Sequence, residues 1–240
     1  MIQAFIATFP PRRQVFEQAL QSIAPQVDRV VAVLNEYDAI PNDLPKYSNV
    51  EYFVPDQDLK DVGKFLIRPD DDDEVFLIDD DILYPGTYVD HMRRIGSGVG
   101  MDQSVLGMQG HLFVRNRKKQ TFTWNNILFH KGQDQILGAD YLGTGTVYAL
   151  GKNIADLAYM TGSQCFVDIR YATWLFDRGI QCWIAPRPEG FLKNILPEDL
   201  KLTSVYETFT RHNGKMLSQQ TLSFILRSRH VGKVYRDVNE

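Results

Sequence analysis

The chain has 240 residues, of which 44% are apolar, 23% charged and 12% aromatic. This composition is typical of a globular protein and excludes disorder, collagen and coiled coil. With 26 basic against 30 acidic residues the formal charge is -4, which does not support a nucleic-acid footprint over the whole surface. The sequence has no apolar run near the ~18 residues of a membrane helix and no signal-peptide pattern in residues 1–10. We therefore expect one cytoplasmic domain, residues 1–240, that binds no nucleic acid.

The charge is unevenly distributed along the chain. Residues 201–240 contain seven basic and three acidic residues, so this C-terminal tail carries a formal charge of +4 and the rest of the chain -8. Such a tail can cover a bound diphosphate as a lid, contact anionic lipid at the inner face of a membrane, or be a solvated helix face. Cys165 and Cys182 are too few for a disulfide framework, which indicates free thiols in a reducing compartment.

The first half of the chain alternates predicted strands and helices. Apolar, β-branched runs predict strands, and apolar residues at helical spacing predict the helices between them. This order is typical of a doubly wound parallel sheet, in which ligands bind beyond the carboxyl ends of the strands. The expected strands are Ile2–Thr8, Arg29–Leu34, Val50–Val54 and Val75–Ile78, and the expected helices are Arg12–Ala24, Asp61–Arg68 and Gly86–Ile95.

The second half is predicted to be richer in β-structure. No repeat or low-complexity linker separates the halves, so we divide the single domain only into residues 1–95, 96–200 and the tail 201–240. Short strands are expected at Leu112–Val114, Thr121–Trp124, Val147–Leu150 and Ile180–Ile184, and helices at Lys152–Tyr159, Ile169–Asp177 and Met216–Arg229.

Three consecutive carboxylates, Asp79-Asp80-Asp81, directly follow the buried strand Val75–Ile78. Their mutual repulsion raises their pKa values unless a cation or a polar ligand lies beside them. Strand alternation sends Asp79 and Asp81 to the same side. Mg²⁺ and Mn²⁺ take one or two such carboxylates and fill their other positions with water and substrate phosphates. The triplet therefore indicates a diphosphate substrate.

Four segments together resemble the nucleotide-sugar half of family 2-like glycosyltransferases with the GT-A fold. They are Thr8-Phe9-Pro10-Pro11-Arg12 after the first strand, Asn35 after the second, Asp61-Val62-Gly63-Lys64-Phe65, and the Asp-x-Asp segment Asp79 to Pro85. The resemblance implies a Rossmann-like, mostly parallel central sheet with helices on both faces and a β-rich acceptor-side half.

Two segments of the second half resemble the acceptor side of the same family. Asp140-Tyr141-Leu142-Gly143-Thr144-Gly145-Thr146 is similar to its acceptor-side turn, where glycines let the backbone approach a sugar. Phe166-Val167-Asp168-Ile169 is similar to the segment that carries the catalytic base. This chain has a single Asp168 where many relatives have an acidic pair.

The resemblance implies an inverting transfer of a sugar from a nucleoside diphosphate sugar, UDP-sugar favoured, to a hydroxyl of a glycan or lipid-linked acceptor, as in bacterial-type surface polysaccharide biosynthesis. A divalent cation, Mn²⁺ or Mg²⁺, withdraws charge from the leaving group while a carboxylate deprotonates the acceptor. The implied nucleotide-sugar contacts are Thr8, Pro10, Arg12, Asn35, Asp61, Lys64, Asp79 and Asp80; Gly143, Thr144 and Gly145 face the acceptor, Asp168 is the base, and Asp81 with Asp79 holds the metal, with His212 or His230 as a candidate further ligand.

Each of these residues also has a structural interpretation. Arg12 and Lys64 can be helix-surface charges, and Asp168 can be the N-cap of the following helix. Trp124, Trp174 and Trp183 can stack on sugar rings, but large apolar side chains more often belong to the core.

Three other functions compete with glycosyl transfer. A haloacid-dehalogenase-type phosphatase also places Asp-x-Asp after an apolar strand, but near the N-terminus. A sugar-nucleotide pyrophosphorylase shares the fold class, but its Gly-rich basic first loop is absent from Ala7–Arg13. A catalytically inactive nucleotide-sugar or glycan-binding module would differ from a transferase only in turnover.

Overall fold

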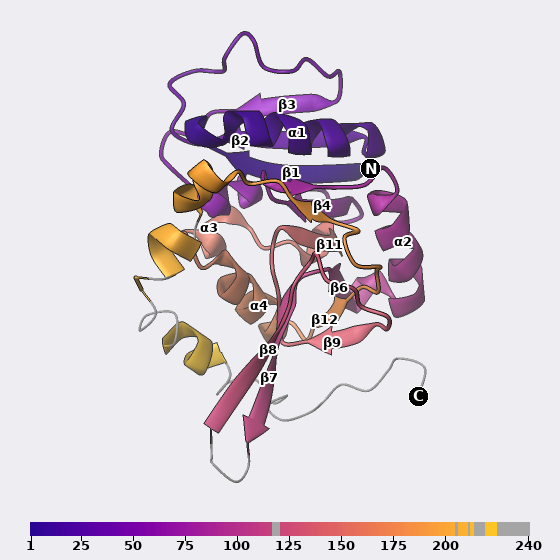
Figure 1. Cartoon of the computed structure of the whole chain (residues 1–240). Helices are drawn as coiled ribbons and strands as arrows, with labels where there is room; N and C mark the ends of the chain where they lie inside the picture. The colour runs from indigo at the N-terminus through magenta and orange to yellow at the C-terminus, as the bar shows by residue number, and fades with distance from the viewer. Residues whose placement is uncertain (117–120, 205, 211, 214–218, 225–240) are drawn as a thin grey trace.

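The computed structural model describes residues 1–116, 121–204, 206–210, 212–213 and 219–224. Its centre is an eight-stranded sheet in the order β3-β2-β1-β4-β11-β6-β12-β9 (Figure 1). Strands β3, β2, β1 and β4 are mutually parallel, and β6 and β12 run in the same direction, whereas β11 and β9 run against them. The predicted α/β class with a mostly parallel central sheet is confirmed.

The first half supplies one side of this sheet. Strands β1 (Ile2–Thr8), β2 (Arg29–Leu34), β3 (Val50–Phe53) and β4 (Glu74–Ile78) lie close to their predicted bounds. Helix α1 (Arg13–Ile23) connects β1 to β2, and α2 (Tyr88–Val99) follows the short strand β5 (Ile82–Leu83). The runs in β1, β2 and β4 are almost wholly apolar because both faces of these strands are buried.

The second half completes the sheet and adds a three-stranded sheet, β10-β7-β8. Strand β11, between β4 and β6, joins the two halves of the chain in one sheet. The hairpin of β7 and β8 extends away from the body of the molecule (Figure 1). The strands are β6 (Ser104–Gly107), β7 (Gly110–Asn116), β8 (Thr121–Ile127), β9 (Leu137–Ala139), β10 (Tyr141–Leu142), β11 (Thr146–Leu150), β12 (Gln181–Ile184) and β13 (Lys193–Asn194), which pairs with β5.

Side chains of the central strands alternate between two hydrophobic clusters, one on each face of the sheet. In β4, Phe76 and Ile78 pack with α1 and α2, whereas Val75 and Leu77 pack with α3 (Leu157–Met160) and α4 (Val167–Asp177). Helices therefore cover both faces, as expected. Trp174 belongs to the second cluster and Trp183 packs against the first, so both are core residues.

Three predicted helices differ from the structure. The segment expected at Asp61–Arg68 is a 3-10 helix, η3 (Lys60–Phe65), and the segment expected at Lys152–Tyr159 is divided between η5 (Gly151–Asn153) and α3. Helix α2 continues past its expected end at Ile95 and stops before Gly100, whose φ is 77°. Glycine at position 96 inside α2 is explained by close packing, because a Cβ there would lie only 2.7 Å from the Tyr148 ring.

The tail begins with the 3-10 helix η6 (Glu198–Thr203) and a π-helical turn, η7 (Tyr206–Thr210). Of the helix expected at Met216–Arg229, residues 219–224 are described and helical. Of the seven basic tail residues only Lys201 lies in the described part of the chain, and it pairs with Glu198. None of the described helices is long and apolar enough to cross a membrane.

Candidate active site

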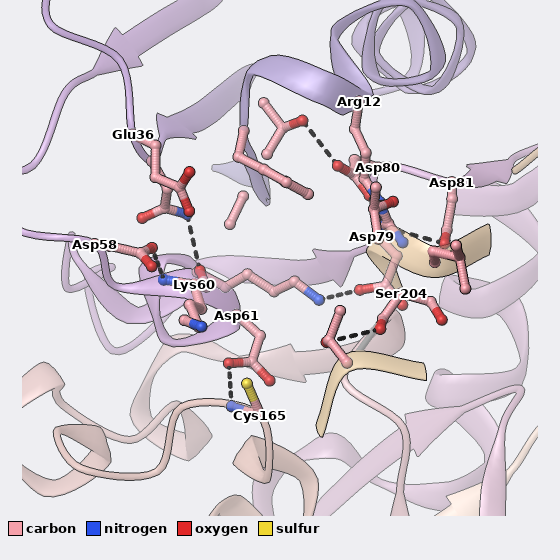
Figure 2. A pocket seen from close by; sticks show the side chains of 18 residues that line it. Arg12, Glu36, Asp58, Lys60, Asp61, Asp79, Asp80, Asp81, Cys165 and Ser204 are labelled. Carbon is pink, nitrogen blue, oxygen red and sulfur yellow. Dashed lines mark hydrogen bonds and ion pairs between the residues drawn. The ribbon is translucent and has the colours of Figure 1, made fainter. Parts of the chain in front are cut away.

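Several loops meet at the carboxyl ends of β1, β2 and β4 and enclose a cavity of about 480 Å³, within the usual range of small-molecule sites. Figure 2 shows the lining side chains. Six of them are carboxylates and three are basic, so the cavity is acidic. The lining residues are Ala7, Thr8, Phe9, Arg12, Asn35, Glu36, Asp58, Lys60, Asp61, Lys64, Asp79, Asp80, Asp81, Cys165, Leu202, Thr203, Ser204 and Thr208.

The structure brings most of the expected nucleotide-sugar contacts to this cavity, including all three residues of the acidic triplet. Pro10 is exposed at the first position of η1 (Pro10–Arg12) and does not line the cavity. His212 is exposed and likewise is not a lining residue, and His230 lies outside the described residues.

Asp79 is held from two sides. Its carboxylate pairs with the ammonium group of Lys64, and its backbone N–H donates to the hydroxyl of Tyr84 at 2.9 Å. That hydroxyl in turn donates to the carbonyl of Gly145 at 2.7 Å. A Cβ on Gly145 would overlap the Asp79 carboxylate, so any other residue here would force that side chain to move. The turn that contains Gly145 thus shapes the acidic end of the cavity.

Asp80 and Asp81 share the guanidinium of Arg12. Arg12 Nη1 lies 2.7 Å from Asp80 Oδ1 and 3.2 Å from Asp81 Oδ2, and the Thr8 hydroxyl donates to Asp80 at 2.8 Å. Burial, together with the charges of Asp79 and Asp80, raises the pKa of Asp81 to about 7. One guanidinium therefore neutralises this carboxylate pair incompletely.

Arg12 and Lys64 are not helix-surface charges. Their exposed fractions are 9% and 3%, and each faces carboxylates. Burial, the largest single influence, acts to lower the pKa of Lys64, but the charge and hydrogen bond of Asp79 together with the charges of Asp168 and Asp61 outweigh it and raise that pKa, so the ammonium stays charged. Buried cations of this kind are costly unless they are paired, which explains why they accompany the acidic triplet.

Asp168 lies outside the cavity lining, and Lys64 connects it to the acidic cluster. The Asp168 carboxylate accepts bonds from the backbone N–H of Thr144 at 2.9 Å and from its hydroxyl at 2.8 Å. The carbonyl of Thr144 lies 3.4 Å from Lys64 Nζ. Asp168 is the second residue of α4, whose N-cap is Phe166, so the N-cap interpretation is wrong. Burial raises the pKa of Asp168.

The opposite wall of the cavity is built from strained backbone. Among the described residues other than glycine, three have positive φ, namely Glu36 at 59°, Lys60 at 50° and Cys165 at 70°, and all three line the cavity. Such conformations cost about 1–3 kcal/mol each and persist where surrounding contacts impose them. Their concentration at one cavity makes it the candidate functional site.

Asn35 and Asp61 impose parts of this wall. Asn35 accepts from Leu59 N and donates to the Lys60 carbonyl, both at 3.0 Å, so its side chain positions this loop rather than facing the cavity freely. Asp61 accepts from the Cys165 N–H at 2.8 Å, and burial raises its pKa to about 6. Both cysteines are free thiols, Cys182 buried and Cys165 half-buried in the cavity wall.

Residues of the tail form part of the cavity wall, although the sequence analysis named none of these lining residues. Thr203 accepts from Arg12 Nε at 3.0 Å, which fastens η6 to the acidic cluster. Glu36, Asp58, Lys60 and Cys165 also escaped prediction. Glu36 directly follows Asn35 at the end of β2, so its position offered a signal, whereas the others are brought in by loops.

The donor set suits a hard divalent cation. Asp79 and Asp81 offer carboxylate oxygens, with 41% and 19% of their side chains exposed, respectively. No group of three or more His, Cys, Asp or Glu side chains with metal-binding geometry occurs among the described residues. Mg²⁺ sites ordinarily use one or two carboxylates and take the rest from water and phosphate, so two aspartates fit such an ion.

No protein-family model and no curated protein sequence matches the chain, but solved structures share its fold. One is a 4-diphosphocytidyl-2C-methyl-D-erythritol synthase, with a TM-score of 0.50, 10% identity, and coverage of 87% of this chain and 99% of that one. Another is a nucleotidyl transferase from Methanothermobacter thermautotroptrophicus (Mth528), with a TM-score of 0.50, 15% identity, and coverage of 89% and 99%. A197 from STIV matches with a TM-score of 0.44, too low to support an inference. At these identities the likeness shows the fold alone, an α/β fold shared with nucleotidyl transferases.

Proposed function

We propose that the protein is a metal-dependent glycosyltransferase that moves a sugar, with inversion, from a nucleoside diphosphate sugar to a hydroxyl acceptor. The observation that carries this proposal is that one network of contacts connects two carboxylates able to hold a metal with a third carboxylate able to act as a base. Asp79 and Asp81 face the cavity, and Asp168 is tied to them through Thr144 and Lys64.

The acidity of the cavity supports the metal requirement. A nucleoside diphosphate is an anion, and a wall of six carboxylates and three cations repels it. A divalent cation held by Asp79 and Asp81 would supply Lewis-acid stabilisation of the leaving diphosphate. Lys64 and Arg12 add fixed positive charge beside the same phosphates, and Glu36 and Asp58 offer acceptors for nucleoside N–H and O–H groups.

Asp168 is proposed as the general base. Its raised pKa brings it closer to neutral pH, where a carboxylate accepts a proton more effectively. Thr144 donates two hydrogen bonds to one oxygen, Oδ1, which fixes the carboxylate and leaves Oδ2 for an acceptor hydroxyl. The acceptor, a glycan or a lipid-linked sugar in this proposal, would approach from the side of the 143–145 turn.

The proposed membrane contact of the tail rests on basic residues that, Lys201 excepted, lie outside the described part.

Asp168→Asn tests the proposal. A panel of nucleotide sugars with Mn²⁺ is first screened for binding and for hydrolysis of the donor. Asn keeps the size of the side chain and can still accept from Thr144, so donor affinity and melting temperature should stay near wild type. Transfer should fall by at least ~10²-fold because the proton acceptor is lost. A fully active Asp168→Asn protein would remove Asp168 from the mechanism.

Nucleotidyl transfer is the second candidate, because two solved structures with this fold carry the name nucleotidyl transferase or a related synthase name. In this chain the loop after β1 is Phe9-Pro10-Pro11-Arg12. The one cation of this loop, Arg12, already pairs with Asp80 and Asp81. A nucleotidyl transferase would release pyrophosphate from a nucleoside triphosphate and a sugar phosphate. Pyrophosphate release without any donor hydrolysis would favour this candidate, and nucleotide-sugar binding without turnover would indicate an inactive module.

A further inference from the structure

A stacked pair of aromatic rings lies on β7 and β10, and β10 contacts α4, the helix that carries Asp168. His111 and Tyr141 face each other across the antiparallel pair of β7 and β10, with ring centroids 4.3 Å apart and planes inclined by 17°. Both side chains are only half-buried. Part of each side chain therefore remains accessible to solvent. Neither residue lines the cavity at the carboxyl ends of β1, β2 and β4.

The backbone connects this pair rigidly to Asp168. Tyr141 belongs to β10, which leads directly into the turn whose Thr144 holds the Asp168 carboxylate. Two backbone bonds flank β10 and tie it to residues 109–111, one from Asp140 N to the His111 carbonyl and one from Gly143 N to the Gln109 carbonyl, each 2.9 Å long. Tyr141 also packs on the cluster that contains Ile169, the residue after Asp168.

The electrostatics agree with this placement. Burial lowers the pKa of His111, and the negative charge of Asp168 acts against that shift. Burial raises the pKa of Tyr141, with a further contribution from Asp168. Asn126 lies directly opposite His111 across the antiparallel pair of β7 and β8, and its side chain also acts to raise the pKa of His111.

We propose that the His111–Tyr141 pair is an acceptor subsite that binds a pyranose ring and presents one of its hydroxyls to Asp168. The inference rests on the proposed function and identifies the acceptor as a sugar. A pyranose has apolar C–H faces and an equator of hydroxyls, so it needs an aromatic surface together with polar groups at the rim. The paired rings offer the surface, and the Tyr141 hydroxyl and the Asn126 amide offer donors and acceptors.

Histidine proton NMR on the full chain tests the subsite directly. The probes are the methyl glycosides of glucose, galactose, mannose and N-acetylglucosamine, added one at a time with and without UDP and Mn²⁺. At least one glycoside should shift the His111 resonances. His91 is the matched internal control, since its ring also contacts an aromatic, Phe191 at 4.9 Å, but belongs to α2 on the other face of the sheet.

Substitutions separate stacking from other effects. Tyr141→Ala should lower the affinity for the glycoside that shifts the His111 resonances by about tenfold, which is the scale of one aromatic contact. Tyr141→Phe should keep most of the affinity, because it retains the ring. UDP affinity should be unchanged in both. If Tyr141→Ala does not fold, Tyr141→Leu replaces it, since leucine fills part of the volume without a ring.

The outcomes distinguish this inference from the proposed function. No His111 shift with any glycoside, equal shifts at His91, or wild-type affinity in Tyr141→Ala would overturn the subsite even if donor hydrolysis is found. Glycoside binding at His111 in a protein that neither binds nor cleaves nucleotide sugars would retain the subsite and refute the proposed function.

Discussion

Gly145→Ala introduces a single methyl group at the point where the acceptor-side turn meets the acidic cluster. The new Cβ would overlap the Asp79 carboxylate, with even the farther oxygen, Oδ1, only 3.0 Å away. Asp79 cannot retreat freely because Lys64 holds its carboxylate and Tyr84 its backbone N–H. Overpacking of this kind typically costs about 1–3 kcal/mol, so we expect the free energy of unfolding to fall by that amount.

The effect on ligand binding should accompany the effect on stability. Moving Asp79 disturbs a proposed metal ligand and its pairing with Lys64, so affinity for UDP with Mn²⁺ should fall by at least about tenfold, which corresponds to about 1.4 kcal/mol. Urea unfolding measures the first effect and calorimetry the second.

Gly98→Ala is the matched control. Gly98 lies inside α2, and a methyl group added there would have no neighbouring atom within 4 Å, so alanine should stabilise the protein by about 0.5–1 kcal/mol and leave nucleotide affinity unchanged. If Gly145→Ala is as stable as wild type and binds UDP and Mn²⁺ equally well, the assigned contact between the turn and Asp79 is refuted.

Three further perturbations test other parts of the site. Asp81→Ala should abolish the dependence of UDP binding on a divalent cation, and equal wild-type affinity in EDTA would contradict the metal bridge. Asp61 has a folded-state pKa of about 6 against ~3.9 in an unfolded chain, so the folded protein holds the extra proton and its free energy of unfolding should decrease as pH rises from about 4 to about 6. Asp61→Asn should flatten that slope, and an unchanged pH profile would show that Asp61 is not responsible. Thr203→Val removes the hydrogen bond from Arg12 Nε and should speed amide exchange across residues 198–204. In the wild type, UDP with Mn²⁺ should slow amide exchange in the same segment. If the exchange rates are the same with and without the nucleotide, the tail is not a lid.

Local sequence was sufficient to predict the elements whose burial is uniform. Strands β1 and β2 begin and end where apolar, β-branched runs predict, because strands buried on both faces consist mostly of apolar residues. The same logic located Asp79 to Asp81, since three carboxylates directly after a buried strand must lie at the carboxyl edge of the sheet. Helix α1 followed from its apolar spacing.

The contacts of these residues depend on how the whole chain packs. The 3-10 form of η3 places Lys64 against Asp79. The start of α3, by contrast, has a local marker that the sequence analysis missed, the N-cap Asp156, whose carboxylate accepts from the Tyr159 N–H. The bond from Thr144 to Asp168 joins residues 24 positions apart, and the bond from Arg12 to Thr203 joins residues 191 apart. Local propensity carries no information on such pairs, because their geometry is set by how the sheet and its loops pack. The local sequence therefore identified the residues that carry the chemistry. Only the tertiary packing of the whole chain determined the cavity, its strained wall and the position of the ring pair near Asp168.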